Sequence, residues 1–198
     1  MSRAIYSFRQ ARRDWWQDVE AFVHHGLSPR RGWRRRVQLI SATAMPPVLC
    51  CLCYRLGRWS YTHGWERCAA SFRWLNQLCF GASISPSSEL GPGLYIPHPA
   101  AVVVDATAGP GLRVYAGASL YRALEALQPP GDDSCRPVLG RGVVVGAKAA
   151  VSGPVQIGDD AVISFNAVVR RDVPPGASVL QSPLRNYKVG RTLRPATP

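Results

Sequence analysis

The chain has 198 residues, which is long enough for one domain with a core, or for a domain plus an appendage. Its formal net charge is +12. Its first segment is charged and aromatic, without the apolar stretch of a secretory signal, so we expect the six cysteines to be free thiols in a reducing cytosol. The basic charge raises nucleic acid as a partner, but the arginines form no recognised binding motif, and we expect no nucleic acid.

The charge is placed unevenly and divides the sequence into regions. Residues 1–80 hold thirteen arginines against four acidic residues, together with all six tryptophans. The remainder is rich in Gly, Val, Ala and Pro. We therefore predict a helical, Arg- and Trp-rich N-terminal region at 1–80, a repeat domain at 81–182 and a C-terminal tail at 183–198.

Helical signals dominate the N-terminal region. Apolar residues recur at mostly helical spacings over 5–23, which predicts an amphipathic helix that ends at Gly26 and Pro29. An arginine-rich run at 30–36 leads into an apolar stretch at 37–56, with Pro46 and Pro47 at its middle. A further helix is expected from about 65 to 80.

The apolar stretch at 37–56 has the length of one membrane span, but two adjacent prolines argue against a straight transmembrane helix. One interpretation is a pair of helices at the membrane interface, where Trp favours the headgroup level and Arg is attracted to anionic lipid. It predicts a cytoplasmic protein in peripheral contact with the cytoplasmic face of the inner membrane. The alternative is a soluble helical domain with core tryptophans and solvated arginines. Both stay open, with a slight preference for the membrane.

Cys50, Cys51 and Cys53 are close enough in sequence to raise the question of a metal cluster. Zinc ligands usually come as two spaced pairs with histidines, and the sequence offers no second pair. We expect no metal site.

The second region repeats with a period of six. The aliphatic or alanine series runs Ile84, Leu90, Ile96, Val102, Ala108, Val114 and Leu120, and resumes as Leu139, Val145, Val151, Ile157, Ile163 and Val169. A second small or apolar residue follows four positions after most of these. This period is typical of a hexapeptide β-helix, in which three hexads make one triangular coil and residues eighteen apart stack. The predicted fold class is an all-β parallel β-helix preceded by an α-helical region.

The repeat is interrupted at 125–138, which contains a Pro-Pro-Gly turn signal. Solenoids insert loops on one face, often the binding face. We therefore expect an extruded loop at 125–138, within two coils of His98, the histidine inside the repeat.

Four segments resemble the serine acetyltransferase branch of the hexapeptide-repeat acyltransferases, over about residues 50 to 187. They are Tyr54-Arg55-Leu56-Gly57-Arg58-Trp59, Cys79-Phe80-Gly81-Ala82-Ser83-Ile84, Leu90-Gly91-Pro92-Gly93-Leu94-Tyr95-Ile96-Pro97-His98 and Arg171-Asp172-Val173-Pro174-Pro175-Gly176. The resemblance is nearest to the colanic-acid acetyltransferase type, which shares a short helical head and an Asp-rich loop ending in Cys and Pro, and whose acceptor is a sugar on a lipid carrier.

The resemblance implies a left-handed β-helix, acetyl-CoA as donor, and a homotrimer with active sites at subunit boundaries; a dimer of trimers stays open. His98 falls on the family's catalytic histidine, which would take the proton of the acceptor hydroxyl. An acid would hold its other ring nitrogen, and Asp105, Asp132 and Asp133 are the candidates, of which Asp105 and Asp133 are taken as predicted catalytic residues.

Motif alignment also implies donor-binding residues. Pantetheine would lie along the groove between subunits, near Gly146, Ala147 and Asn166. Arg170 and Arg171 are weaker candidates for contact with the CoA phosphates, because the turn they occupy is usually structural.

The chain departs from the serine acetyltransferase pattern at four places, one of which is the glycine-rich part of the loop, replaced here by Glu125 to Pro130. Pro97 stands where the family has an Asp, Ser83 where it has another, and Arg136 in the stretch that carries its loop histidine. Most groups that grip serine are therefore absent. The main interpretation is an O-acetyltransferase acting on a sugar hydroxyl of a cell-surface polysaccharide or its lipid-linked precursor. The alternatives are a serine O-acetyltransferase of cysteine biosynthesis and a catalytically degenerate trimeric scaffold.

Overall fold

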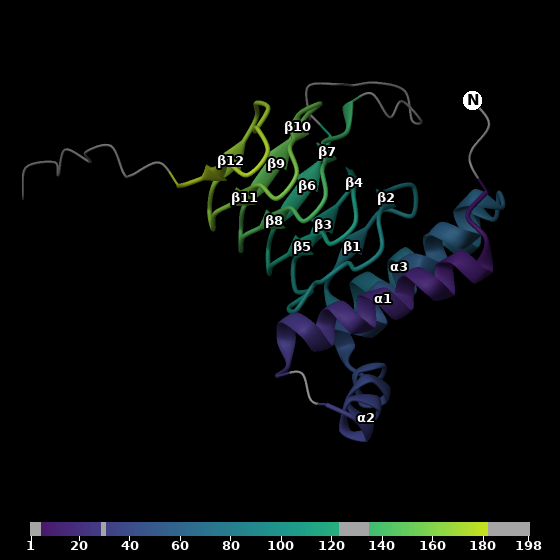
Figure 1. Cartoon of the computed structure of the whole chain (residues 1–198). Coiled ribbons are helices and arrows are strands. Elements are labelled where there is room, and N and C mark those ends of the chain that lie inside the picture. Colours follow the sequence, from purple (N-terminus) through teal and green to yellow (C-terminus); the bar gives the residue numbers. More distant parts are fainter. Residues whose placement is uncertain (1–4, 29–30, 123–134, 182–198) are drawn as a thin grey trace, which may run out of the picture.

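A group of helices lies against one end of a parallel β-helix (Figure 1). The computed structural model describes residues 5–28, 31–122 and 135–181. Within these ranges the helices are α1 (Phe8–Gly26), α2 (Trp33–Ala42), α3 (Pro46–Thr62) and α4 (Glu66–Phe80). Helices α1 and α3 lie along the first coil, and α2 projects away from it (Figure 1).

The helix boundaries follow local sequence signals. Ser7 caps α1, because its hydroxyl accepts a hydrogen bond from the backbone N–H of Gln10. Helix α3 begins with Pro46 and Pro47. Proline is tolerated there because backbone N–H groups in the first turn of a helix have no acceptor within the helix. Helix α4 is followed by Gly81, which has the left-handed conformation of a C-cap at φ +70°. The helices predicted at 5–23 and 65–80 and the break at the paired prolines are confirmed.

Thirteen short strands in the described residues form three parallel sheets, which are the faces of the β-helix. Face A has the order β1-β3-β6-β9-β12, face B the order β10-β7-β4-β2, and face C the order β13-β11-β8-β5. The strands are β1 (Ser83–Ile84), β2 (Glu89–Leu90), β3 (Val103–Val104), β4 (Thr107–Ala108), β5 (Arg113–Val114), β6 (Ser119–Tyr121), β7 (Val138–Leu139), β8 (Val144–Val145), β9 (Ala150–Ser152), β10 (Gln156–Ile157), β11 (Val162–Ile163), β12 (Val168–Val169) and β13 (Ser178–Val179).

The repeat residues fill the interior of this prism. Every member of the predicted six-residue series is at most 6% exposed. In each two-residue strand one side chain points inward and its neighbour outward, as the period of two in an extended chain requires. The predicted parallel β-helix with a helical region before it is confirmed.

Strand register shows where the coils depart from eighteen residues. Val162 pairs with Val144, eighteen positions earlier, but Val144 pairs with Arg113, thirty-one positions earlier. The longer coil contains residues 123–134, so most of the loop predicted at 125–138 lies outside the described residues. Val138 belongs to β7, so the predicted end of the loop is wrong by at least one residue.

The first coil carries a second departure. The predicted stacking of Val102 on Ile84 is wrong, because Ile84 pairs with Val104. The corner between faces C and A, which runs from Ile96 to Val104, is two residues longer than the repeat. The next corner, between faces A and B, is two residues shorter and ends at Ala108.

The shift of phase changes which residue fills the long corner. Ala100 occupies the position predicted to be inward and small, yet it is exposed. Val102, fully buried, closes the interior in its place. Ala100 and Ala101 are therefore exposed outside the prism, two and three positions after His98.

A buried ion pair joins the helices to the open end of the first coil. Arg55 of α3 donates from Nε and Nη2 to the carboxylate of Asp18 in α1, both at 2.9 Å, and to the carbonyls of Leu90 and Gly91 at 2.6 and 2.8 Å. Asp18 also accepts the Leu94 N–H at 2.7 Å. Burial opposes the charge of Arg55, but the Asp18 carboxylate more than offsets this and raises the pKa of Arg55. These bonds satisfy backbone groups that have no further coil to pair with.

Candidate active site at the His98 corner

His98 lies in the long C–A corner of the first coil. Pro97 and Pro99 flank it and fix the backbone φ on both sides. The imidazole is exposed, and no hydrogen bond or ion pair reaches it from the parts of the chain that the structure describes. A histidine held in this way is accessible to a substrate hydroxyl.

The C–A corners of successive coils form one column that starts at the His98 corner, along the lower edge of the β-helix in Figure 1. Each corner donates one backbone N–H to the corner before it, from Gly117 to Ala100, from Lys148 to Ala116 and from Asn166 to Ala147, at 2.9–3.0 Å. Adjacent strands in a sheet lie about 4.8 Å apart, so the Asn166 corner is about 14 Å along the column.

The residues predicted to bind the donor belong to this column. Ala147 is half-buried and Asn166 is exposed. Gly146 has a packing role of its own, because a Cβ there would lie 2.6 Å from the backbone nitrogen of Phe165. The structure therefore brings the three residues to the same edge as His98, two and three coils further along.

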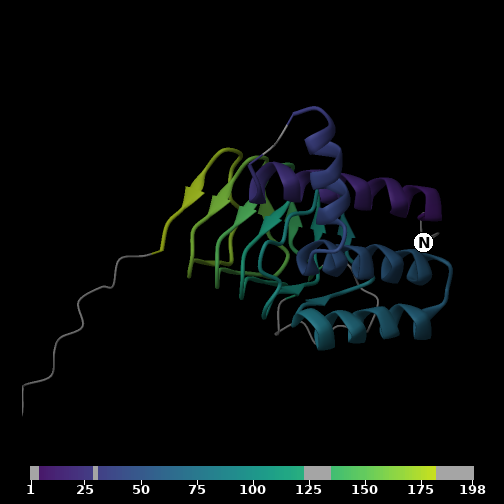
Figure 2. The same ribbon diagram turned by 90° about the horizontal axis from the view of Figure 1, so that it is seen from below.

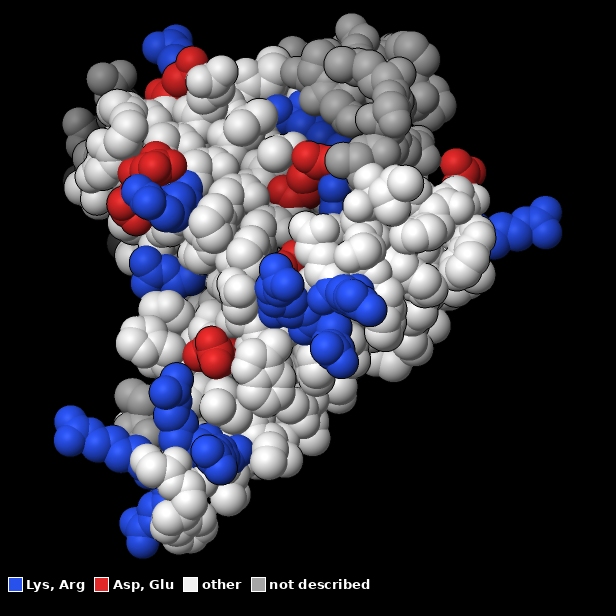
Figure 3. Space-filling view, turned by 45° about the vertical axis from the view of Figure 1, so that its right-hand side comes forward, with Lys and Arg blue, Asp and Glu red and all other residues white. Residues whose placement is uncertain are grey.

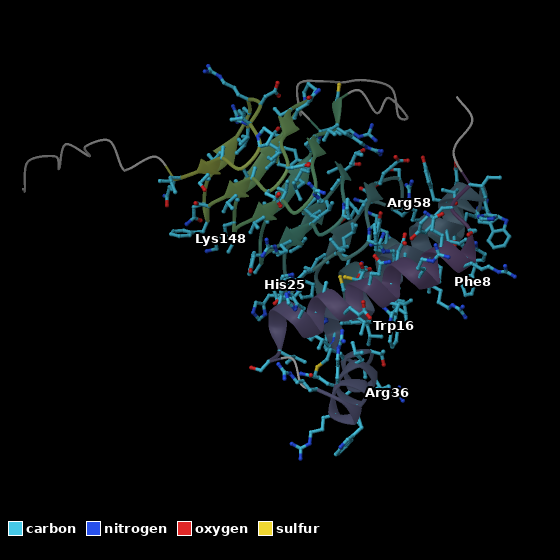
Figure 4. All side chains as sticks on the ribbon, in the orientation of Figure 1. Phe8, Trp16, His25, Arg36, Arg58 and Lys148 are labelled. Carbon is cyan, nitrogen blue, oxygen red and sulfur yellow. The ribbon has the colours of Figure 1, made fainter. Side chains whose placement is uncertain are left out.

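Lys148 is a member of the column that the sequence-based prediction left out. Its side chain is exposed, and Figure 4 places it at the lower edge of the β-helix, the edge that leads down to His25 at the end of α1. The signal was present in the sequence, since Lys148 directly follows the predicted Ala147. An ammonium group here offers a positive charge to a phosphorylated donor.

Aromatic side chains flank the His98 corner on face C. The Tyr95 ring lies 5.4 Å from the ring of His25 and 6.4 Å from that of Tyr115, measured between centroids. Burial lowers the pKa of His25, and the nearby positive charges of Arg113 and His24 lower it further. This contact between α1 and face C was not foreseen, because it depends on how the helix lies across the coil.

Asp105 lies on the other corner, across strand β3 from His98. Its Oδ2 accepts the Arg122 Nε–H at 2.9 Å, and its Oδ1 is 2.8 Å from the Nε of Arg136. The second contact is an ion pair in which the N–H is not aligned for a hydrogen bond. Arg136 also donates to the carbonyl and hydroxyl oxygens of Ser87. Both arginines flank residues 123–134, so one carboxylate ties together the two ends of that segment.

The structure therefore does not bring Asp105 to His98 within one chain. Asp132 and Asp133 lie outside the described residues. No group of three or more metal-ligating side chains converges within the described ranges. Cys50 and Cys51 belong to α3 and are packed in the core.

Comparisons with known proteins agree with this fold. The family model "Bacterial transferase hexapeptide (six repeats)" matches residues 136–171. The chain is 33% identical to the serine acetyltransferase of Helicobacter pylori over 139 residues, 69% of this chain and 78% of that protein. It is 32% identical to the serine acetyltransferase of Mycobacterium tuberculosis over 132 residues, but the match spans only 56% of that enzyme.

Solved structures show the same fold. The serine acetyltransferase of Neisseria gonorrhoeae superposes with a TM-score of 0.74 at 23% identity, covering 89% of this chain and 66% of that one. The soybean serine acetyltransferase apoenzyme gives 0.74 at 22%, covering 87% and 67%. The fold and the family match define a left-handed β-helix transferase of the hexapeptide-repeat class. Within it, the chain belongs to the serine acetyltransferase family and is an O-acetyltransferase.

Proposed function

We propose that the chain transfers the acetyl group of acetyl-CoA to a hydroxyl group, with His98 as the general base. The observation that carries this proposal is the exposed His98 on a lengthened, proline-flanked corner in a member of this family. His98 takes the hydroxyl proton while the oxygen attacks the thioester carbonyl. The carbon–sulfur bond then breaks, and the imidazolium returns the proton to the leaving thiolate, giving free CoA and the acetyl ester.

The C–A column fits the donor. It offers a small residue at Ala147, an amide at Asn166 and a cation at Lys148 on one exposed edge. Amide and backbone groups can form hydrogen bonds with the pantetheine arm of CoA, and the Lys148 ammonium can pair with the phosphates of CoA. In a homotrimer, which the resemblance implies, a neighbouring copy would complete the site at the His98 corner. Such an arrangement accounts for the absence of a partner for His98 among the described residues of one chain.

L-serine is the acceptor that the relatives support, because the similar proteins in Helicobacter pylori and Mycobacterium tuberculosis are serine acetyltransferases. This agrees with the alternative interpretation of the sequence better than with its main one, a polysaccharide acceptor. The second candidate, a saccharide hydroxyl, keeps one specific observation in its favour. Arg136, at the position of the family's loop histidine, is 3% exposed and contacts Asp105 and Ser87.

Release of free CoA, followed with a thiol reagent, tests the proposal and separates the acceptors. We expect acetyl-CoA turnover that depends on added L-serine. Turnover with a panel of hexoses and not with serine would favour the saccharide instead. No release with any hydroxyl acceptor, from a folded protein, would contradict acetyl transfer and favour the scaffold interpretation.

A further inference from the structure

Helix α2 leaves a stripe of large apolar side chains in solvent. Trp33, Val37 and Ile40 are 70%, 55% and 66% exposed, and their spacing places them on one side of the helix. The opposite side carries Leu39 and Ala42, which pack against α1. The stripe is therefore the outer face of a helix that is already anchored to the body of the protein.

Arginines frame this stripe. Arg31, Arg34, Arg35 and Arg36 are all exposed, and none of them forms an ion pair with an acidic side chain among the described residues. Basic side chains gather over the projecting lower part of the molecule, which carries α2 (Figure 3). An apolar stripe with a border of guanidinium groups matches an interface that is apolar within and anionic at its surface.

Helix α1 extends the same surface. Trp16 is 40% exposed, and together with Trp33, Arg35 and Arg36 it lines a groove of about 530 Å³ between α1 and α2. Figure 4 shows Trp16 and Arg36 on the side of α1 that faces away from the β-helix. A flat surface that meets α2 would thus meet Trp16 without contacting the His98 corner column.

The structure favours contact with a membrane surface over insertion. Among the described residues no single helix is long and apolar enough to cross a membrane, although α2 and α3, bent by 65°, pass the same test of length and composition as a pair. Helix α3 is committed to the first coil through Arg55 and Arg58, which bond to backbone groups of the coil. Of these two helices, α2 is therefore the one that offers its apolar side to lipid.

We propose that α2 lies in the surface of an anionic membrane, with Trp33, Val37 and Ile40 among the acyl chains and the surrounding arginines at the headgroups. The inference does not depend on the acceptor or on acetyl transfer. In this arrangement the β-helix lies beside the membrane and does not contact the lipid.

Flotation of the full chain with vesicles tests this proposal. We expect binding to phosphatidylcholine vesicles that contain about a third phosphatidylglycerol, and little binding to phosphatidylcholine alone. Screening by 0.5 M salt should weaken it, because the Debye length then falls to about 4 Å. The triple change Arg34→Gln, Arg35→Gln, Arg36→Gln should weaken partitioning by roughly two orders of magnitude, whereas Lys at the same three positions should retain most of it.

The apolar stripe has a matched control on another helix. Trp33→Ser with Ile40→Ser should lower vesicle binding at least tenfold. Trp74 and Leu78 of α4 are 67% and 71% exposed, and in Figure 2 α4 lies on the side of α3 opposite α2. Trp74→Ser with Leu78→Ser should leave binding unchanged.

Three results would overturn the proposal. They are no binding to either vesicle, equal binding with and without the anionic lipid, and equal loss from the α2 and α4 changes. Tight binding to double-stranded DNA that is insensitive to the Trp33 and Ile40 changes, with weaker vesicle binding, would instead assign the arginines to nucleic acid. A thermal melt of each α2 variant serves as the control for folding, and we expect the melting curve to match that of the original chain.

Discussion

Two corners on either side of strand β3 use the same solenoid backbone differently. The C–A corner is two residues longer than the repeat and leaves His98 exposed. The A–B corner is two residues shorter and holds Asp105 between Arg122 and Arg136. The difference teaches that corner length, together with the partners that the register supplies, decides whether a polar side chain meets substrate or is tied to its neighbours.

Removal of the imidazole should have the largest effect. His98→Ala should lower kcat/KM for acetyl transfer about 1000-fold, because positioned general bases typically contribute 100- to 10,000-fold. The exposed side chain makes no contact in the described fold, so Tm should change by less than about 2 °C. Steady-state CoA release and a thermal melt on the same preparation check both statements, and near-normal turnover would remove His98 from the mechanism.

Substitution at the A–B corner, which carries Asp105, should lower the free energy of unfolding. Asp105→Asn removes the carboxylate charge that faces the Arg136 guanidinium. The Arg136 side chain is 2% exposed and the Asp105 side chain is 26% exposed. Breaking a fully buried pair costs about 3–5 kcal/mol, and the partial exposure of Asp105 reduces the expected loss to about 2 kcal/mol. Urea unfolding measures this loss. A control at an exposed pair, Asp159→Asn beside Arg141, should cost well under 1 kcal/mol.

Close stacking of the C–A column predicts a comparable cost at Gly146. Gly146→Ala sets a Cβ 2.6 Å from a backbone nitrogen and should destabilise the fold by about 2–3 kcal/mol. Gly176→Ala, in open space at φ +69°, should show only the cost of left-handed backbone, about 1 kcal/mol. If both variants unfold at the same urea concentration, stacking does not explain Gly146.

Much of the fold was predictable because the core is periodic. A six-residue period places one aliphatic side chain inside each face, and all of them are buried. The phase shift was not predictable, since Ala100 and Val102 are both small and apolar and either could fill the interior. The contacts of Asp105 were hidden for a related reason. Its partners Arg122 and Arg136 lie seventeen and thirty-one positions away, and the second separation includes residues 123–134, which the repeat does not place.

Lys148 should affect donor binding and not the chemical step. Lys148→Gln should raise KM for acetyl-CoA three- to tenfold and leave kcat near its original value, because the charge lies two coils away from His98. Arg141→Gln, an equally exposed change at a different corner, should leave both parameters unaltered. A fall in kcat with constant KM would contradict the assignment of the column to the donor.

The smallest predicted effect is a difference in alkylation rate between buried and exposed cysteines, which reports on the packing of the first coil. Burial raises the pKa of the Cys50 thiol to about 12, and burial also raises the pKa of Cys51. At pH 8 both thiols should resist iodoacetamide, whereas the exposed Cys68 and Cys79 should be alkylated within minutes. Mass spectrometry of peptides gives the pattern. Early labelling of Cys50 in the His98 or Asp105 variant would show that the coil had opened.

The most direct test of the account compares the two corners in one assay. His98→Ala and Asp105→Asn are purified side by side, and kcat/KM for CoA release is measured for each, normalised to the folded fraction. The account predicts that Asp105→Asn keeps at least a third of the original turnover and exceeds His98→Ala by at least 100-fold. Equal losses in the two variants would place both residues in one catalytic unit and contradict the separation of the two corners.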